Sequence, residues 1–213
     1  MHKTLDDWWV PDMDTRKVLP RPRGLPGFLG LCKKKRVALD IGAHVGTWTV
    51  PLARVFQYVA AFEPAGDSRA CLDVNIAEAC LRNVEIRDKA CGSRPFKCVM
   101  VQDERPGRAK SSGNRWAMPA IGGDHRIETI DTLALSLDID FIKIDVEGAD
   151  IEVLNGACAT IEKWHPVLVV EVSDKIPPER FHREEGDVDK FMSSIGYVEA
   201  MRHKADRAYI WKP

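Results

Sequence analysis

Two acidic residues and two glycines stand where short apolar runs end, and their types favour a cationic ligand. Asp40, Gly42 and Gly46 follow the first of these runs, and Glu63 closes the second. A carboxylate at Asp40 would repel a phosphate group but would attract an ammonium or sulfonium group. Glu63 stands where an acid can accept hydrogen bonds from both hydroxyl groups of a ribose. S-adenosylmethionine carries both cationic groups and no phosphate, so this pair of acids favours a methyl-donor site over a dinucleotide site.

A strand, a turn and a helix between residues 37 and 56 would position the first group. Val37–Ile41 is typical of a strand buried on both faces, and apolar residues at helical spacing predict a helix over 47–56. Gly42 can adopt a positive φ or let a ligand touch the backbone. A dinucleotide fingerprint needs a third glycine at the position of His44, so its absence disfavours a nicotinamide-dependent oxidoreductase. The alternatives are acids that only cap turns, and a non-catalytic binding module.

A second group of ionisable residues surrounds the run Phe141–Val146. Lys143 and Asp145 lie within this run, Glu147 follows it, and Glu171 closes the later apolar run over 166–172. Because ligands of open α/β sheets bind beyond the carboxyl ends of the strands, we expect both groups of acids to meet there. One alternative has Asp145, Glu147 and Glu171 hold Mg²⁺. A metal site is not part of our prediction.

Further segments are predicted to complete the site and the domain. Asp88 ends a third predicted strand, over 84–87, where it can accept from the amino group of an adenine or be merely solvated. Residues 1–31, rich in proline and glycine, are predicted to form an N-terminal arm, and residues 32–213 a single methyltransferase domain. This arm, the polar segment over 102–119 and the segment over 173–185 are expected to carry acceptor-specific residues.

Composition sets limits on the class of protein. The chain has 213 residues, of which 45% are hydrophobic and 30% charged, and this suits one folded α/β domain. A net charge of −1 makes a nucleic-acid partner unexpected, and no apolar run reaches the ~20 residues of a membrane span. The six cysteines are scattered without metal-ligand spacing, so we predict a cytoplasmic location, with no zinc site and no disulfide framework. The oligomeric state stays open, a homo-oligomer included.

These stretches together resemble the FkbM family of S-adenosylmethionine-dependent methyltransferases (EC 2.1.1.-) over roughly residues 37–172. The matching stretches are LDIGAHVGTWTVPLA, FEP, Asn75, the region of Ala90, ETIDTL, and FIKIDVEGADIEVLNGA followed by VLVVEV. The resemblance implies an α/β fold with a Rossmann-like class I methyltransferase sheet, mostly parallel with a reversed last strand and helices on both faces. It also implies O-methylation of a sugar or another small-molecule or glycan acceptor.

The resemblance assigns roles to individual residues. Those expected to bind S-adenosylmethionine are Asp40, Gly42, His44, Gly46, Glu63, Asp88 and Ala90. The family usually has asparagine at position 44, but an imidazole can still donate a hydrogen bond to the cofactor's carboxylate. Glu147 or Asp145 is predicted to be the general base for the acceptor hydroxyl. Lys143 would support orientation or stabilise oxyanion character, with an ion pair inside the acidic cluster as its alternative.

Overall fold

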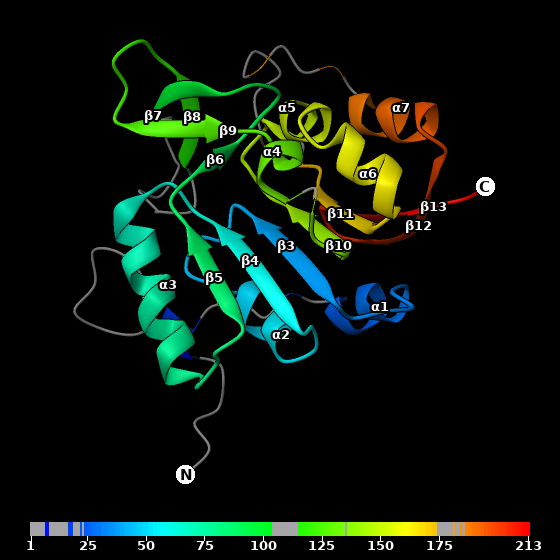
Figure 1. Ribbon diagram of the computed structural model, residues 1–213, viewed down its shortest axis with the longest axis horizontal. Coiled ribbons are helices and arrows are strands. Elements are labelled where there is room, and N and C mark those ends of the chain that lie inside the picture. The colour runs from blue at the N-terminus through cyan, green and yellow to red at the C-terminus, as the bar shows by residue number, and fades with distance from the viewer. Residues whose placement is uncertain are drawn as a thin grey trace.

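Seven strands form the central sheet, in the order β12–β13–β11–β10–β3–β4–β5 (Figure 1). The computed structural model describes residues 7–8, 17–18, 22, 24–103, 115–134, 136–173, 181, 184 and 186–213. From one edge to the other, the strands are Tyr197–His203, Asp206–Trp211, Val167–Glu171, Ile139–Ile144, Val37–Ile41, Tyr58–Phe62 and Val84–Arg87. The strands from β11 to β5 are parallel, whereas β13 is antiparallel to both of its neighbours. The predicted α/β sheet with a reversed last strand is therefore confirmed.

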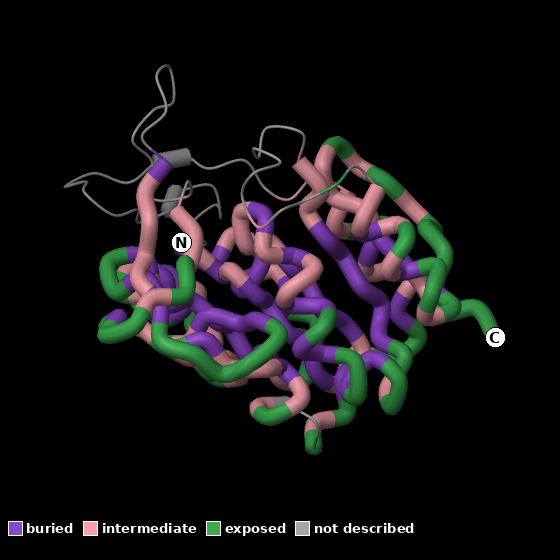
Figure 2. The backbone as a smooth tube through the Cα atoms, turned by 90° about the horizontal axis from the view of Figure 1, so that it is seen from above, coloured by how far each residue is buried: buried purple, intermediate pink, exposed green. Residues whose placement is uncertain are grey.

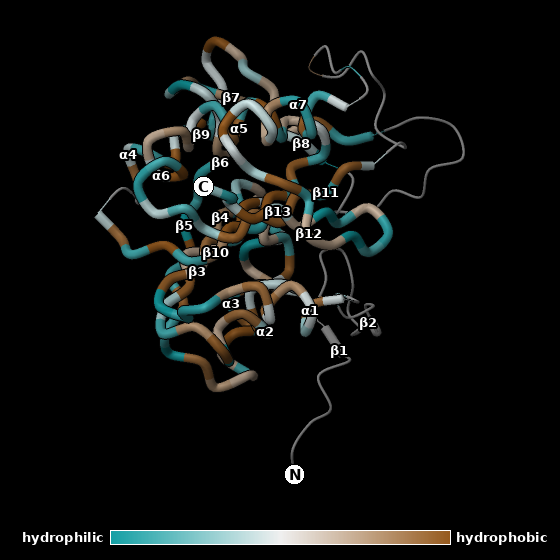
Figure 3. The backbone as a smooth tube through the Cα atoms, turned by 90° about the vertical axis from the view of Figure 1, so that its right-hand side faces the viewer, coloured by the Kyte–Doolittle hydropathy of each residue, from teal (hydrophilic) through white to brown (hydrophobic). Residues whose placement is uncertain are grey.

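Helices cover both faces of this sheet because its central strands are apolar on both sides. All five residues of β3 are buried: Leu39 and Ile41 contact one core cluster, and Ala38 contacts another on the opposite face. The helices are α1 Leu25–Gly30, α2 Thr49–Ala53, α3 Gly66–Glu78, α4 Ile130–Ala134, α5 Asp150–Asn155, α6 Cys158–Trp164 and α7 Asp187–Ser194. The first three pack on the face of Ala38 and the last four on the face of Leu39. Buried residues, purple in Figure 2, and hydrophobic residues, brown in Figure 3, accordingly concentrate in the middle of the molecule.

A second, four-stranded sheet lies beyond the carboxyl ends of β3, β4 and β5 (Figure 1). It contains β6 Ala90–Cys91, β9 His125–Glu128, β7 Phe96–Gln102 and β8 Arg115–Pro119. Within this sheet, β7 forms an antiparallel pair with β8. A short pair of strands, β1 Asp7–Trp8 and β2 Lys17–Val18, lies nearer the N-terminus.

Two aspartates in the first turns of helices connect these helices to other elements. Asp67 is the second residue of α3, and its carboxylate accepts two hydrogen bonds from Arg115 at 2.8 and 2.9 Å. Asp131 is the second residue of α4, and its carboxylate accepts from the backbone N–H groups of Ala159 and Thr160 at the start of α6. Both carboxylates bind partners far away in the sequence, which local patterns do not reveal.

The C-terminal part of the predicted arm packs into the domain. Phe28 of α1 is fully buried, and its ring centroid lies 6.0 Å from that of Trp48 in a stacked pair. A domain boundary between residues 31 and 32 stays a prediction, and most of residues 1–23 lie outside the described part. Within the part of the chain that the structure describes, no helix has the length and apolar character of a membrane span.

Candidate active site

A cavity of about 550 Å³ lies at the carboxyl ends of the central strands, under the second sheet. Its volume is within the range of small-molecule sites. Six of the predicted site residues line it: Gly42, His44, Glu63, Ala90, Asp145 and Glu147. The other four, which do not reach its surface, are Asp40, Gly46, Asp88 and Lys143. The structure thus brings six of the ten predicted residues to one cavity and leaves the other four off its surface.

The two glycines act through backbone conformation and close packing. Gly42 has a φ of 84°, and a Cβ at this position would lie 1.8 Å from the backbone oxygen of Asp145. The ends of β3 and β10 can therefore approach only because residue 42 has no side chain. Gly46 has a φ of 97°, and its Cβ would lie 2.6 Å from Leu72 Cδ1, so its role is to let the turn pack on α3.

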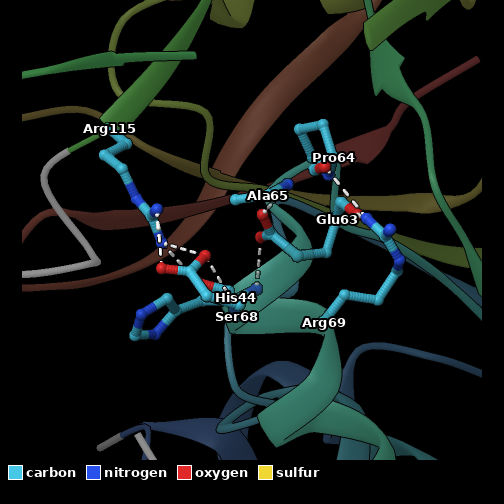
Figure 4. Close-up of polar contacts among 8 residues, drawn as sticks. His44, Glu63, Pro64, Ala65, Ser68, Arg69 and Arg115 are labelled. Carbon is cyan, nitrogen blue, oxygen red and sulfur yellow. Dashed lines mark hydrogen bonds and ion pairs between the residues drawn. The ribbon is translucent and has the colours of Figure 1, made fainter. Parts of the chain in front are cut away.

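Glu63 lines the cavity, and its buried carboxylate lies beside His44 and Ala65 (Figure 4). Its Oε2 accepts the backbone N–H of His44 and its Oε1 that of Ala65, each at 2.8 Å. Burial raises the pKa of Glu63 to about 7, although these two hydrogen bonds oppose the shift. Each oxygen can accept a second hydrogen bond, so the carboxylate is suited to the two hydroxyl groups of a ribose.

His44 lies beside this carboxylate in a left-handed backbone conformation, with a φ of 49°. Burial and the nearby charge of Arg115 lower the pKa of His44 to about 4. The imidazole is therefore neutral at pH 7, with one nitrogen that donates a hydrogen bond and one that accepts. Arg115, at the end of the polar segment expected to bind substrate, is held by Asp67 and by the Ser68 hydroxyl at 2.8 Å.

Asp40 lies behind the cavity wall, with 1% of its surface exposed. Its carboxylate accepts a hydrogen bond of 2.5 Å from the Thr49 hydroxyl and so connects β3 to α2. Burial raises the pKa of Asp40 to about 6, against the hydrogen bond from Thr49 and the charge of Lys143. Asp40 does not line the cavity, so contact between its carboxylate and a cationic ligand stays a prediction.

A buried lysine and three carboxylates adjoin the cavity on the face of α2. Lys143 is fully buried, and its Nζ lies 2.7 Å from Asp206 Oδ1 and 3.7 Å from Asp145 Oδ2. Burial alone would lower the pKa of Lys143, but the charges of Asp145, Asp206 and Glu171 outweigh it and raise this pKa above its ordinary value. The ion pair that sequence reasoning left as the alternative for Lys143 is the arrangement in this structure.

Glu171 lines the cavity next to Asp145 and shares a hydrogen bond with it. The charge of Asp145, burial and this hydrogen bond raise the pKa of Glu171 to about 9. At neutral pH Glu171 is therefore protonated and can donate its proton to the Asp145 carboxylate in the hydrogen bond.

Glu147 and Asp88 have different surroundings. Glu147 lines the cavity, and its φ of 54° with the 111° of Gly148 turns the chain sharply from β10 towards α5. Asp88 lies in a separate cavity of about 410 Å³ beside Arg69 and Asp73, so its predicted contact with an adenine finds no support in the geometry. Among the described residues, no group of three histidines, cysteines, aspartates or glutamates could hold a metal ion.

An apolar wall of the cavity was not predicted. Phe96 and Met100 of β7, together with Ala117 of β8, which pairs with Met100, line it from the second sheet. The alternation of Phe96, Cys98 and Met100 along one strand was the available signal, because residues two apart share one face. That this face closes over the main sheet depends on how the two sheets meet.

Fold and site together define a class I methyltransferase domain. The Methyltransferase FkbM domain model matches residues 40–199. Methyltransferase FkbM from Methylobacillus flagellatus KT is similar, with a TM-score of 0.57 and 19% identity over 85% of this chain and 45% of that one. The chain therefore spans less than half the length of the Methylobacillus protein. The chain belongs to the FkbM methyltransferase family.

Other solved methyltransferases share the fold. Ribosomal protein L11 methylase from Lactobacillus delbrueckii subsp. bulgaricus matches with a TM-score of 0.54 and 9% identity, over 96% of this chain and 91% of that one. SMU.1697c from Streptococcus mutans, solved in complex with SAH, matches with a TM-score of 0.50 and 12% identity over 90% and 97%. No curated protein matches the sequence significantly. Family membership implies S-adenosylmethionine as the cofactor. The carboxylate of Glu63, which can accept further hydrogen bonds beside the Gly42 turn, fits the hydroxyl groups of the cofactor's ribose.

Proposed function

We propose that this domain transfers a methyl group from S-adenosylmethionine to a hydroxyl group of a small-molecule or glycan acceptor. One observation carries the proposal. A single cavity brings Glu63 from the end of β4 together with Asp145 and Glu147 from the end of β10. One end thus offers a carboxylate suited to a ribose, and the other offers carboxylates suited to taking up a proton.

On the donor side, four residues would hold the cofactor. Glu63 accepts from the ribose hydroxyls, and the neutral imidazole of His44 can donate to the carboxylate of the methionine portion. Gly42 and Ala90 leave the backbone accessible at the cavity wall. When bound, S-adenosylmethionine supplies an electrophilic methyl group.

On the acceptor side, Asp145 is the better candidate for the base. The proton of the acceptor hydroxyl passes to a carboxylate as the oxygen becomes nucleophilic. Asp145 is 32% exposed at the cavity, has a buried ammonium 3.7 Å away, and contacts a protonated Glu171 that orients it. Glu147 is the alternative base because it lines the same cavity.

Labelled methyl transfer tests this proposal. The full chain is incubated with methyl-labelled S-adenosylmethionine and a panel of sugars and polyols, and mass spectrometry locates the label. We expect methyl ethers on oxygen, and a loss of about 10²–10⁴-fold in rate for Asp145→Asn with SAH affinity retained. Asp138→Asn, which removes an acid paired with Arg36 away from the cavity, is the control. Label on no acceptor would contradict O-methylation of this class of acceptor. An unchanged Asp145→Asn rate with loss in Glu147→Gln would move the base to Glu147.

A further inference from the structure

The reversed last strand of the sheet brings an aspartate to the buried lysine behind the cavity. Asp206 is the first residue of β13 and lies outside residues 40–199, which the family model matches. It faces Glu171 in the antiparallel pair of β13 with β11, and it lies 63 residues from Lys143 in sequence. Its side chain is 20% exposed, against 0% for that of Lys143.

Asp206 and Asp145 compete for the same ammonium group. A buried ammonium without a carboxylate partner is strongly destabilising, so Lys143 requires at least one of them. Asp206 lies at hydrogen-bond distance, 2.7 Å, and the backbone oxygen of Ile144 takes a second hydrogen bond at 3.3 Å. Asp145, at 3.7 Å, feels the charge of Lys143 without a hydrogen bond to it. Its carboxylate oxygens are left for Glu171 and for the cavity.

We propose that Asp206 is a positioning residue, which holds Lys143 and thereby keeps Asp145 at the cavity wall in its pair with Glu171. The inference rests on the proposed role of Asp145 as the base. The titratable groups that face Lys143 are Asp145, Asp206, Glu171 and, from β3, Asp40. The Trp48 ring, 5.1 Å from Nζ, covers another side of the lysine.

Asp206→Asn should change the position of Asp145 between Lys143 and Glu171 in a defined direction. Without the Asp206 charge, Asp145 becomes the nearest unpaired carboxylate of the ammonium and is drawn towards it, away from Glu171. Three of the causes that raise the pKa of Glu171 then weaken together: the charge of Asp145, its hydrogen bond and the charge of Asp206. The pKa of Glu171 falls towards its ordinary value.

Carbon-13 NMR of the glutamate side-chain carboxyl groups tests this in the full chain. The Glu171 resonance is assigned by its loss in Glu171→Gln, and its titration midpoint is compared between variants. We expect the midpoint to fall by about one pH unit in Asp206→Asn, as for the loss of one charge in partly buried surroundings. Asp189→Asn is the matched control. Asp189, on α7, makes an ion pair of the same length, 2.7 Å, with Arg207, which follows Asp206 on β13. Asp189 does not line the cavity. An unchanged midpoint in Asp206→Asn overturns the proposal.

Kinetics with an acceptor from the panel provide the second readout. We expect kcat to fall about 10–100-fold in Asp206→Asn, with KM for S-adenosylmethionine within twofold and partial rescue in Asp206→Glu. An unchanged kcat also overturns the proposal. If Asp206→Asn does not fold, Asp206→Glu is compared with Asp206→Gln. Both side chains are one methylene longer than that of aspartate, and only the first carries the negative charge. Failure of the wild-type chain to methylate any hydroxyl overturns the proposed function instead, while the NMR midpoint still decides the role of Asp206.

Discussion

We expect Glu63 to make cofactor affinity depend on pH, and the pKa of its carboxylate sets the size of the effect. The carboxylate is 7% exposed, and its pKa is raised to about 7, first by burial. Only the ionised form accepts hydrogen bonds on both oxygens, so a ribose favours that form. With a pKa near 7, the ionised fraction is roughly 0.09 at pH 6 and roughly 0.91 at pH 8. The dissociation constant for SAH should therefore fall about tenfold between pH 6 and pH 8.

Glu63→Gln should weaken binding and remove this pH dependence. Both carboxylate oxygens accept backbone N–H groups at 2.8 Å, so the NH₂ group of glutamine must face one of these donors. The donor left without an acceptor costs about 1–3 kcal/mol of folding free energy. Loss of the charge-assisted hydrogen bonds to the ligand, about 1.5–3 kcal/mol, corresponds to about 10–100-fold in affinity.

Isothermal titration calorimetry with SAH between pH 6 and pH 8 measures both effects. Glu85→Gln is the control, since Glu85 is an exposed acid of the neighbouring strand, paired with Arg87 and remote from the cavity. It should keep the wild-type affinity and slope. A wild-type affinity that does not vary over this range, or an unchanged slope in Glu63→Gln, would refute the role given to Glu63. Binding of NADH in place of SAH would refute the choice of cofactor.

Three further outcomes are expected. Gly42→Ala should lower the free energy of unfolding by more than about 2 kcal/mol in urea titrations, because its Cβ would lie 1.8 Å from the Asp145 oxygen. Gly122 is the control: it has a φ of 79° and nothing within 4 Å, so Gly122→Ala should cost only the roughly 1–2 kcal/mol of a residue in the left-handed conformation. Equal costs for the two substitutions would contradict the close approach at Gly42. Phe28→Ala should cost about 3–5 kcal/mol in the same assay, since this fully buried ring belongs to the core, and a neutral change would return α1 to a detached arm. Glu171→Gln should become more stable relative to wild type as the pH rises. Folding raises the pKa of Glu171 from 4.5 to about 9, so its contribution to stability is present at low pH and is lost as the pH rises between those two values. Melting temperatures of the two proteins that change with pH in the same way from pH 5 to pH 9 would exclude the shift.

Much of the fold follows from local patterns in the sequence. The strands Val37–Ile41 and Val84–Arg87 have the predicted bounds, because short apolar runs between turn residues are typical of buried strands. The helix predicted over 47–56 is shorter, with regular helix only from Thr49 to Ala53. Helix ends depend on caps and packing that periodicity does not show.

The sequence by itself determined that carboxylates and glycine turns would gather at one edge of a parallel sheet, because every parallel strand ends there. Only the tertiary structure decided what each carboxylate does, since burial and partners set its charge. It placed Asp40 behind the wall against Thr49, Glu63 at the surface between two backbone N–H groups, and Asp206 on Lys143. The last of these contacts joins residues 63 positions apart through the insertion of a reversed strand, and no local pattern encodes that register.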